Sequence, residues 1–129
     1  MGTPCLVRVY DGEDICLTMR FQYDGYFEGG IGEDLKNLLE NTTAIVNGYG
    51  LHMSSPSFFN GMGCLAAHLV SKYKTRIGNV YLVPENYKED FLVHEYNIKV
   101  EETEVVLECK AKNEDDLEFR FDIYRGACG

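Results

Sequence analysis

The chain has 129 residues, 45% of them hydrophobic and 26% charged, values typical of a soluble globular protein. This length predicts one domain, residues 1–129, with a sizeable hydrophobic core. The 12 basic and 21 acidic side chains give a net charge of −9. That charge argues against duplex nucleic acid or an anionic membrane surface as partners, because both attract clustered lysines and arginines. A small anionic ligand is still compatible with it, since a local pair of cations is enough to hold one.

The cysteines indicate a reducing environment. There are five, an odd number, and no two of them have Cys-x-x-Cys spacing. Most lie in apolar runs, where a free thiol packs as a small hydrophobic group. The first residues lack a basic region followed by a long apolar stretch, and no run approaches the roughly 20 apolar residues that span a bilayer. We therefore expect a cytoplasmic protein, or one of the host cell cytoplasm if it is viral.

Two strands are predicted at residues 5–10 and 15–21, joined by a turn at residues 11–14. Side-chain alternation favours an antiparallel hairpin with one apolar face, because a shift by one residue would place arginines in the apolar layer. The predicted pairs are Cys5–Phe21, Leu6–Arg20, Val7–Met19, Arg8–Thr18 and Val9–Leu17. The other face of the hairpin should therefore carry two neighbouring arginines.

The segment that follows, Arg20-Phe-Gln-Tyr-Asp-Gly-Tyr-Phe-Glu-Gly-Gly30, has an unusual composition. It holds four aromatic residues, two acids, an arginine and three glycines within eleven residues. No packing rule demands that mixture, whereas loops that contact ligands often show it. A helix over residues 33–41 is predicted next, with an apolar leucine face and acids in its first turn.

A second helix is predicted where apolar residues recur at helical spacing from Met62 to Tyr73, with Asn60 as its N-cap. The stretch between the two helices, residues 42–59, is rich in Gly, Ser and Asn and is expected to be irregular.

Four further strands are predicted at residues 80–83, 91–100, 103–109 and 117–123. Apolar side chains such as Leu92, Tyr96, Leu107, Phe119 and Phe121 alternate with charged ones, which indicates an antiparallel sheet with one dry and one wet face. The predicted fold class is therefore α+β. It consists of a mainly antiparallel sheet, made of the N-terminal hairpin and a four-stranded C-terminal meander, with two helices packed on one face.

The aromatic–glycine loop and its surroundings form the candidate ligand site. A nucleotide needs a cation for its phosphate, an aromatic face for its base and an acceptor for its ribose hydroxyls. Arg20, Tyr23 or Tyr26, and Asp24 offer these groups within one short segment. The complete predicted site is Arg8, Arg20, Gln22, Tyr23, Asp24, Tyr26, Glu28, Asn60 and Met62. The alternative is that the loop aromatics merely cover the core and that the glycines flanking Met62 serve close packing.

Catalytic and metal chemistry have weaker support. Cys64 and His68 lie four residues apart on the second helix, as a nucleophile and its base or two metal ligands would. No second ligand pair has matching spacing, so a buried thiol beside a boundary histidine is the favoured interpretation. The glycines of residues 25–32 lack the Lys-Ser/Thr end of a phosphate-binding P-loop. We expect no catalytic constellation, no metal and no cofactor.

Two blocks, Tyr23-Asp-Gly-Tyr26 and Asn60-Gly-Met-Gly-Cys-Leu-Ala-Ala67, carry a resemblance to a family of small uncharacterised proteins of bacteria, prophages and phages. Looser similarity extends over about the first two-thirds of the chain. In the family pattern a proline and a histidine follow the Asp-Gly-Tyr block, whereas this chain has Phe27 there and no histidine before the first helix. The resemblance implies a viral or prophage setting and no particular chemistry.

Three functions are compatible with these observations. The favoured one is a non-enzymatic anti-defence protein that sequesters a nucleotide second messenger, as sponge proteins do, and that is a homo-oligomer. The second is an acidic module that inhibits a host protein, in which case the net charge of −9 is the active feature. The third is a small hydrolase that uses Cys64 and His68.

Overall fold

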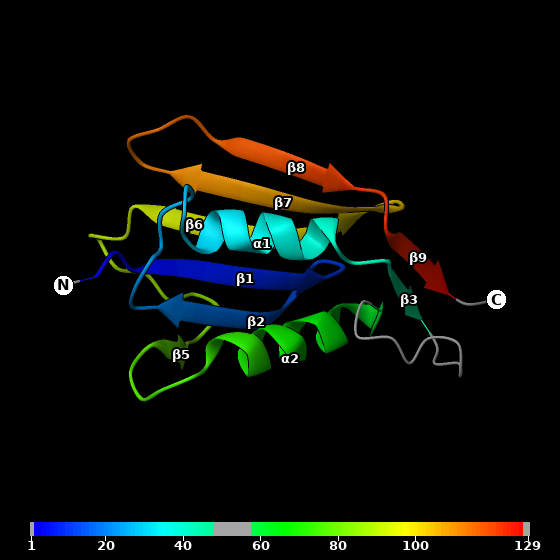
Figure 1. The fold of residues 1–129 in the computed structure, drawn as a ribbon, viewed down its shortest axis with the longest axis horizontal. Helices are drawn as coiled ribbons and strands as arrows, with labels where there is room; N and C mark the ends of the chain where they lie inside the picture. Colours follow the sequence, from blue (N-terminus) through cyan, green and yellow to red (C-terminus); the bar gives the residue numbers. More distant parts are fainter. Residues whose placement is uncertain (1, 48–57, 128–129) are drawn as a thin grey trace.

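A computed structural model describes residues 2–47 and 58–127, which form an α+β fold with a mostly antiparallel six-stranded sheet and two helices (Figure 1). The helices are α1 (Ile31–Glu40) and α2 (Gly61–Tyr73). The strands in chain order are β1 (Cys5–Asp11), β2 (Asp14–Phe21), β3 (Ala44–Asn47), β4 (Phe58–Asn60), β5 (Val80–Leu82), β6 (His94–Glu101), β7 (Glu104–Ala111), β8 (Leu117–Phe121) and β9 (Tyr124–Ala127).

The large sheet has the strand order β5-β2-β1-β6-β7-β8. The β1–β2 hairpin has the predicted register, with Val7 opposite Met19 and Leu6 opposite Arg20. It continues through β6, which runs parallel to β1, and then through the antiparallel strands β7 and β8. The predicted four-stranded meander therefore has three strands. The fourth, β5, pairs with β2 at the opposite edge of the sheet.

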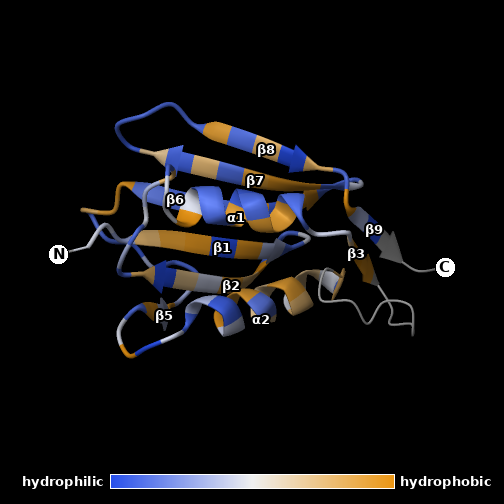
Figure 2. Cartoon of the chain, viewed as in Figure 1, coloured by the Kyte–Doolittle hydropathy of each residue, from blue (hydrophilic) through white to orange (hydrophobic). Residues whose placement is uncertain are grey.

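Both helices cover the same face of this sheet, and the core lies between the two layers (Figure 1). Leu35 and Leu39 of α1 and Leu65 and Leu69 of α2 are completely buried against the apolar side of the sheet. Figure 2 shows the hydrophobic residues of β1 beneath α1, whose outer surface is hydrophilic. Helix α1 begins two residues before the predicted start, and the side chain of Asn60 makes no capping hydrogen bond to α2.

The opposite face of the sheet is only partly wet. The connection from β5 to β6, residues 83–93, crosses β2 and β1 on this side and buries Leu6 completely. Leu92 was expected in the strand that faces the helices, but it lies in this connection, before β6 begins at His94. The prediction of a solvent-exposed outward face is wrong here, because this segment covers part of that face.

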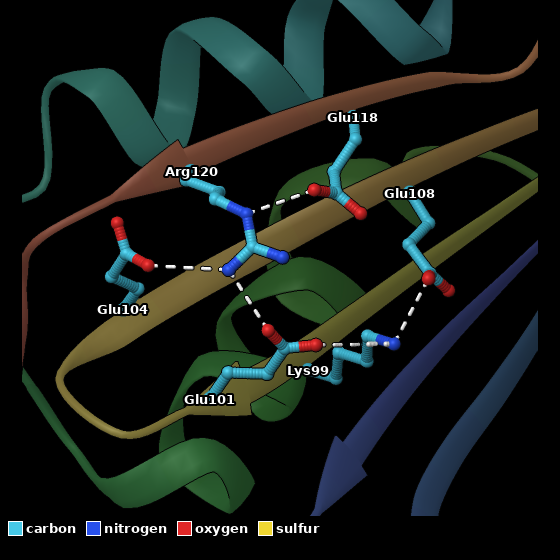
Figure 3. Close-up of polar contacts among 6 residues, drawn as sticks. All are labelled: Lys99, Glu101, Glu104, Glu108, Glu118 and Arg120. Carbon is cyan, nitrogen blue, oxygen red and sulfur yellow. Dashed lines mark hydrogen bonds and ion pairs between the residues drawn. The ribbon is translucent and has the colours of Figure 1, made fainter.

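Farther along, the outward face of β6, β7 and β8 is charged, as its alternation predicts (Figure 3). Arg120 bonds the carboxylates of Glu101, Glu104 and Glu118, and these contacts raise the pKa of its guanidinium. Val106 is completely buried on the same face, between Lys99 and Arg120 in the strand register. The aliphatic stems of long charged side chains can cover such a residue while their charges stay in water.

The segment predicted to be irregular contains two strands, because β3 pairs in parallel with both β4 and β9 in a small second sheet. The rest of that prediction, residues 48–57, lies outside the described residues.

Candidate functional site

The loop between β2 and α1 is anchored to the core through its backbone. The Gly25 N–H donates to the Thr3 carbonyl at 2.7 Å, and the Tyr96 hydroxyl donates to the Gly25 carbonyl at 2.7 Å. Tyr96 is 1% exposed, and burial raises the pKa of its hydroxyl well above the usual range. The Ile31 N–H donates to the Asp24 carbonyl at 2.7 Å and so closes the loop onto the first turn of α1. These contacts make the loop a rigid part of the fold.

Close packing explains two of the glycines in this region. A Cβ atom on Gly25 would lie 2.6 Å from the Thr3 carbonyl oxygen and 2.7 Å from Cys5 Cβ. A Cβ atom on Gly32 would lie 2.8 Å from the ring of Tyr96. Phe27, for its part, stacks on Phe119 with ring centroids 5.6 Å apart. Much of the unusual composition therefore serves the fold and needs no ligand.

Four side chains of the loop are exposed and are not used in this way, and one of them is Glu28. Tyr23 and Tyr26 are 41% and 40% exposed, and Asp24 is exposed with a φ of 62°. Positive φ is uncommon outside glycine, although aspartate tolerates it better than most residues. The Tyr26 hydroxyl donates to Asp24 Oδ1 at 3.1 Å, and this hydrogen bond raises the tyrosine pKa. A strained polar residue between two exposed rings is the part of the loop that a ligand can reach.

Tyr23 and Asp24 line a hollow of about 450 Å³ together with residues at the C-terminal end of α2, and we call it the loop hollow. The guanidinium of Arg76 lies 5.0 Å from the centre of the Tyr23 ring, within cation–π distance. Lys72 adds a second cation to the wall. The hollow therefore combines an exposed ring, two cations and the two carboxylates of Asp24 and Asp34.

The floor of the loop hollow is built by Tyr73. Its ring packs edge-on against Phe21 with centroids 5.2 Å apart, and its hydroxyl donates to the carboxylate of Asp34 on α1. Burial, together with this hydrogen bond, raises the pKa of Tyr73 well above the usual range. Tyr73 therefore stays neutral and ties the two helices together beneath the hollow.

A second hollow, of about 370 Å³, lies between α1 and α2, and we call it the helix groove. It shares Asp34 and Lys72 with the loop hollow. Its other lining residues are Asn37, Leu38, Asn41, Thr42, Phe59 and His68.

The structure separates the predicted site residues into groups. Tyr23 and Asp24 line the loop hollow, with Tyr26 bonded to Asp24. Arg20 points to the opposite face of the sheet, where it bonds Glu89 at 2.6 Å and Gln22 at 2.6 Å. The remaining four are not brought to the loop hollow: Arg8, Glu28, Asn60 and Met62. Met62 is 2% exposed and belongs to the core, and Asn60 lies at the other end of α2.

Arg8 lines a third hollow, of about 500 Å³, on the far face with Lys88, Lys110 and Lys112. None of the described residues that line this hollow is aromatic. It therefore lacks a surface on which the base of a nucleotide could stack.

Of the twelve residues that line the loop hollow, sequence reasoning missed all but Tyr23 and Asp24; the missed ones include Asp34, Lys72 and Arg76. A signal was present, because the basic residues Lys72, Lys74 and Arg76 cluster around the end of the second helix. Their proximity to Tyr23 arises only from packing, since about fifty positions of chain separate the two segments.

The Cys64–His68 pair is not arranged for catalysis. Cys64 is exposed, contrary to the expected buried thiol, because its position on α2 faces away from the core. No hydrogen bond joins the two side chains, and the His68 ring packs against Phe59 with centroids 5.0 Å apart. Within residues 2–47 and 58–127, no group of three or more His, Cys, Asp or Glu side chains could hold a metal ion.

No protein-family model, curated protein or solved structure matches this chain. Neither described helix is long and apolar enough to cross a membrane.

Proposed function

We propose that the protein binds a small nucleotide-type ligand in the loop hollow without converting it. The observation that carries this proposal is the position of Tyr23 and Arg76, which stack at 5.0 Å on the wall of a 450 Å³ hollow that also contains Lys72. The hollow has the volume of a small-molecule site, and most of its lining residues carry polar side chains.

Each group has a role in this proposal. Arg76 and Lys72 bind the phosphate through charge-assisted hydrogen bonds. The exposed ring of Tyr23 stacks on the base, an interaction worth roughly 1–3 kcal/mol per base. The Asp24 carboxylate accepts hydrogen bonds from ribose hydroxyls. The cation assigned from the sequence to Arg20 is thus supplied by Arg76.

The net charge of −9 limits the ligand. A long polyanion would meet the repulsion of the whole surface, whereas a small one is influenced mainly by the charges within about a Debye length, near 8 Å at physiological salt. The proposal is therefore restricted to small anionic ligands.

The biological role we propose is sequestration of a nucleotide second messenger by a viral or prophage protein that blunts a host defence. The setting rests on the resemblance carried by Tyr23-Asp-Gly-Tyr26 and residues 60–67. Sequestration requires affinity and no catalytic group, and Cys64 and His68 are not joined by a hydrogen bond.

The experiment is calorimetry with a panel of mononucleotides and cyclic nucleotides, followed by denaturation and recovery of the ligand. We expect one class to bind and to be recovered intact. Tyr23→Ala and Arg76→Ala should each weaken binding at least tenfold. Tyr81→Ala and Arg125→Ala, which remove exposed side chains outside the hollow, should leave it unchanged.

Failure of the whole panel to bind would overturn the proposal and favour the acidic-module alternative. Recovery of a cleaved ligand would show that the protein is an enzyme, contrary to the proposal. If the Tyr23→Ala variant bound the ligand as tightly as the parent protein, the binding site would lie outside the loop hollow.

A further inference from the structure

The loop hollow and the helix groove share two lining residues, Asp34 of α1 and Lys72 of α2. The two hollows therefore adjoin at these residues, which come from the two helices on one face of the sheet (Figure 1). A ligand that occupied both hollows would pass beside the Lys72 ammonium and the Asp34 carboxylate.

The spacing along α2 places chemical groups at regular intervals along the two hollows. His68 and Lys72 are four residues apart, so they lie on one side of the helix, about 6 Å apart along its axis. Asp34 and Asn41, which face them from the α1 side, are separated by about 10 Å along that helix. The groove is thus an extended site, longer than one ring system needs.

A ring lies at each end, with a cation between. Tyr23 stands at the loop end beside Arg76, and His68 stands at the far end, packed on Phe59 at 5.0 Å. Lys72 lies between them, and within the described part of the chain no carboxylate forms an ion pair with it. A phosphodiester would therefore meet an ammonium that lies over the Tyr73 ring at 5.6 Å, next to the Asp34 carboxylate, which accepts the hydrogen bond of Tyr73.

Amide groups line the far half. Asn37 and Asn41 both face the helix groove, and the Asn41 side-chain N–H donates to the Asn37 backbone carbonyl at 2.8 Å. This hydrogen bond leaves the Asn41 oxygen free to accept from a base edge. Amide side chains recognise base edges by such donor and acceptor pairs.

Building on the proposed function, we infer that the ligand class is a dinucleotide, with two bases joined through a phosphodiester. One base stacks on Tyr23 in the loop hollow, and Lys72 binds the linking phosphate. The second base lies in the helix groove against His68, with Asn37 and Asn41 at its edge.

The experiment compares matched pairs of ligands by calorimetry: adenosine and guanosine monophosphates against the linear and cyclic dinucleotides of the same bases. Because a dinucleotide stacks one additional base, we expect its affinity to exceed that of the mononucleotide by roughly tenfold or more. His68→Ala should remove this gain and leave mononucleotide affinity unchanged, while His68→Phe, which keeps a ring, should restore most of it. Cys64→Ala changes an exposed position on the same helix outside both hollows and should alter neither affinity.

The possible failures are distinguishable. Equal binding of mononucleotides and dinucleotides would overturn this inference and leave the proposed function standing. A gain that survives His68→Ala would place the second base outside the helix groove and would also overturn it. Binding of neither class would overturn the proposed function as well.

Discussion

The sequence placed Arg20 in a ligand site, whereas in the structure its side chain forms an ion pair with Glu89. Substitution of Arg20 therefore distinguishes a structural role from a ligand-binding one. Its Nε lies 2.6 Å from Glu89 Oε1 and its Nη2 lies 3.2 Å from Glu89 Oε2, a bidentate ion pair in which each side chain is 13% exposed. The Tyr87 hydroxyl also donates to Glu89. Arg20 therefore fastens residues 83–93 to the far face of the sheet.

Arg20→Ala leaves the Glu89 carboxylate largely buried without its cation. Removal of one partner of a buried pair costs about 3–5 kcal/mol, and the remaining solvent contact of this pair favours the lower end, about 3 kcal/mol. An unfolding entropy of roughly 2.1 cal/mol/K per residue amounts to about 270 cal/mol/K for this chain. The melting temperature should then fall by about 11 °C.

The assay is urea unfolding with a double-mutant cycle that adds Glu89→Ala, since the cycle isolates the pairwise energy. Arg125→Ala is the matched control, because its ion pair with Asp122 joins side chains that are 51% and 72% exposed. We expect the control to change the free energy of unfolding by less than about 1 kcal/mol. If Arg20→Ala is as mild as Arg125→Ala, Arg20 does not hold the crossing segment and its assignment to a ligand regains support.

Three further substitutions test the core and the loop. Tyr96→Phe should cost about 1–3 kcal/mol in unfolding free energy because it leaves the buried Gly25 carbonyl unpaired, while Tyr81→Phe, at an exposed ring, should cost almost nothing; equal effects in thermal melts would contradict the anchoring of the loop. Phe119→Ala should cost about 2 kcal/mol, below the usual range for a buried phenylalanine, because the ring stacks on Phe27 but is only partly buried; a loss within about half a kcal/mol in urea unfolding would refute this packing. Cys64→Ser should leave both stability and ligand affinity unchanged because the thiol is exposed, and loss of function in a folded variant would revive the hydrolase hypothesis.

Local patterns predicted the elements well where one side of a segment is buried. The alternation of residues 5–21 predicted the β1–β2 register, pair by pair from Cys5–Phe21 to Val9–Leu17. The helical recurrence from Met62 to Tyr73 predicted α2 to within one residue. These predictions succeed because side-chain direction depends only on position along a strand or helix.

Partners distant in sequence could not be predicted in this way. The composition of residues 80–82 predicts a strand but does not indicate its partner. Only the assembled sheet shows that this strand lies beside β2. The same holds for the candidate site, because Tyr23 meets Arg76 only when α2 packs beside the loop. Sequence reasoning therefore recognised Tyr23 and Asp24 but assigned them the wrong neighbours.

By itself the sequence determined the fold class, the first hairpin, both helices and the charged outer face of β6 to β8, since each follows from the period of apolar residues in a short window. Only the tertiary structure decided that β6 lies parallel to β1, that residues 83–93 cover Leu6 and engage Arg20, and that the loop hollow takes its cations from the end of α2. The physical reason is that periodicity specifies which side of an element is buried and carries no information about which element buries it.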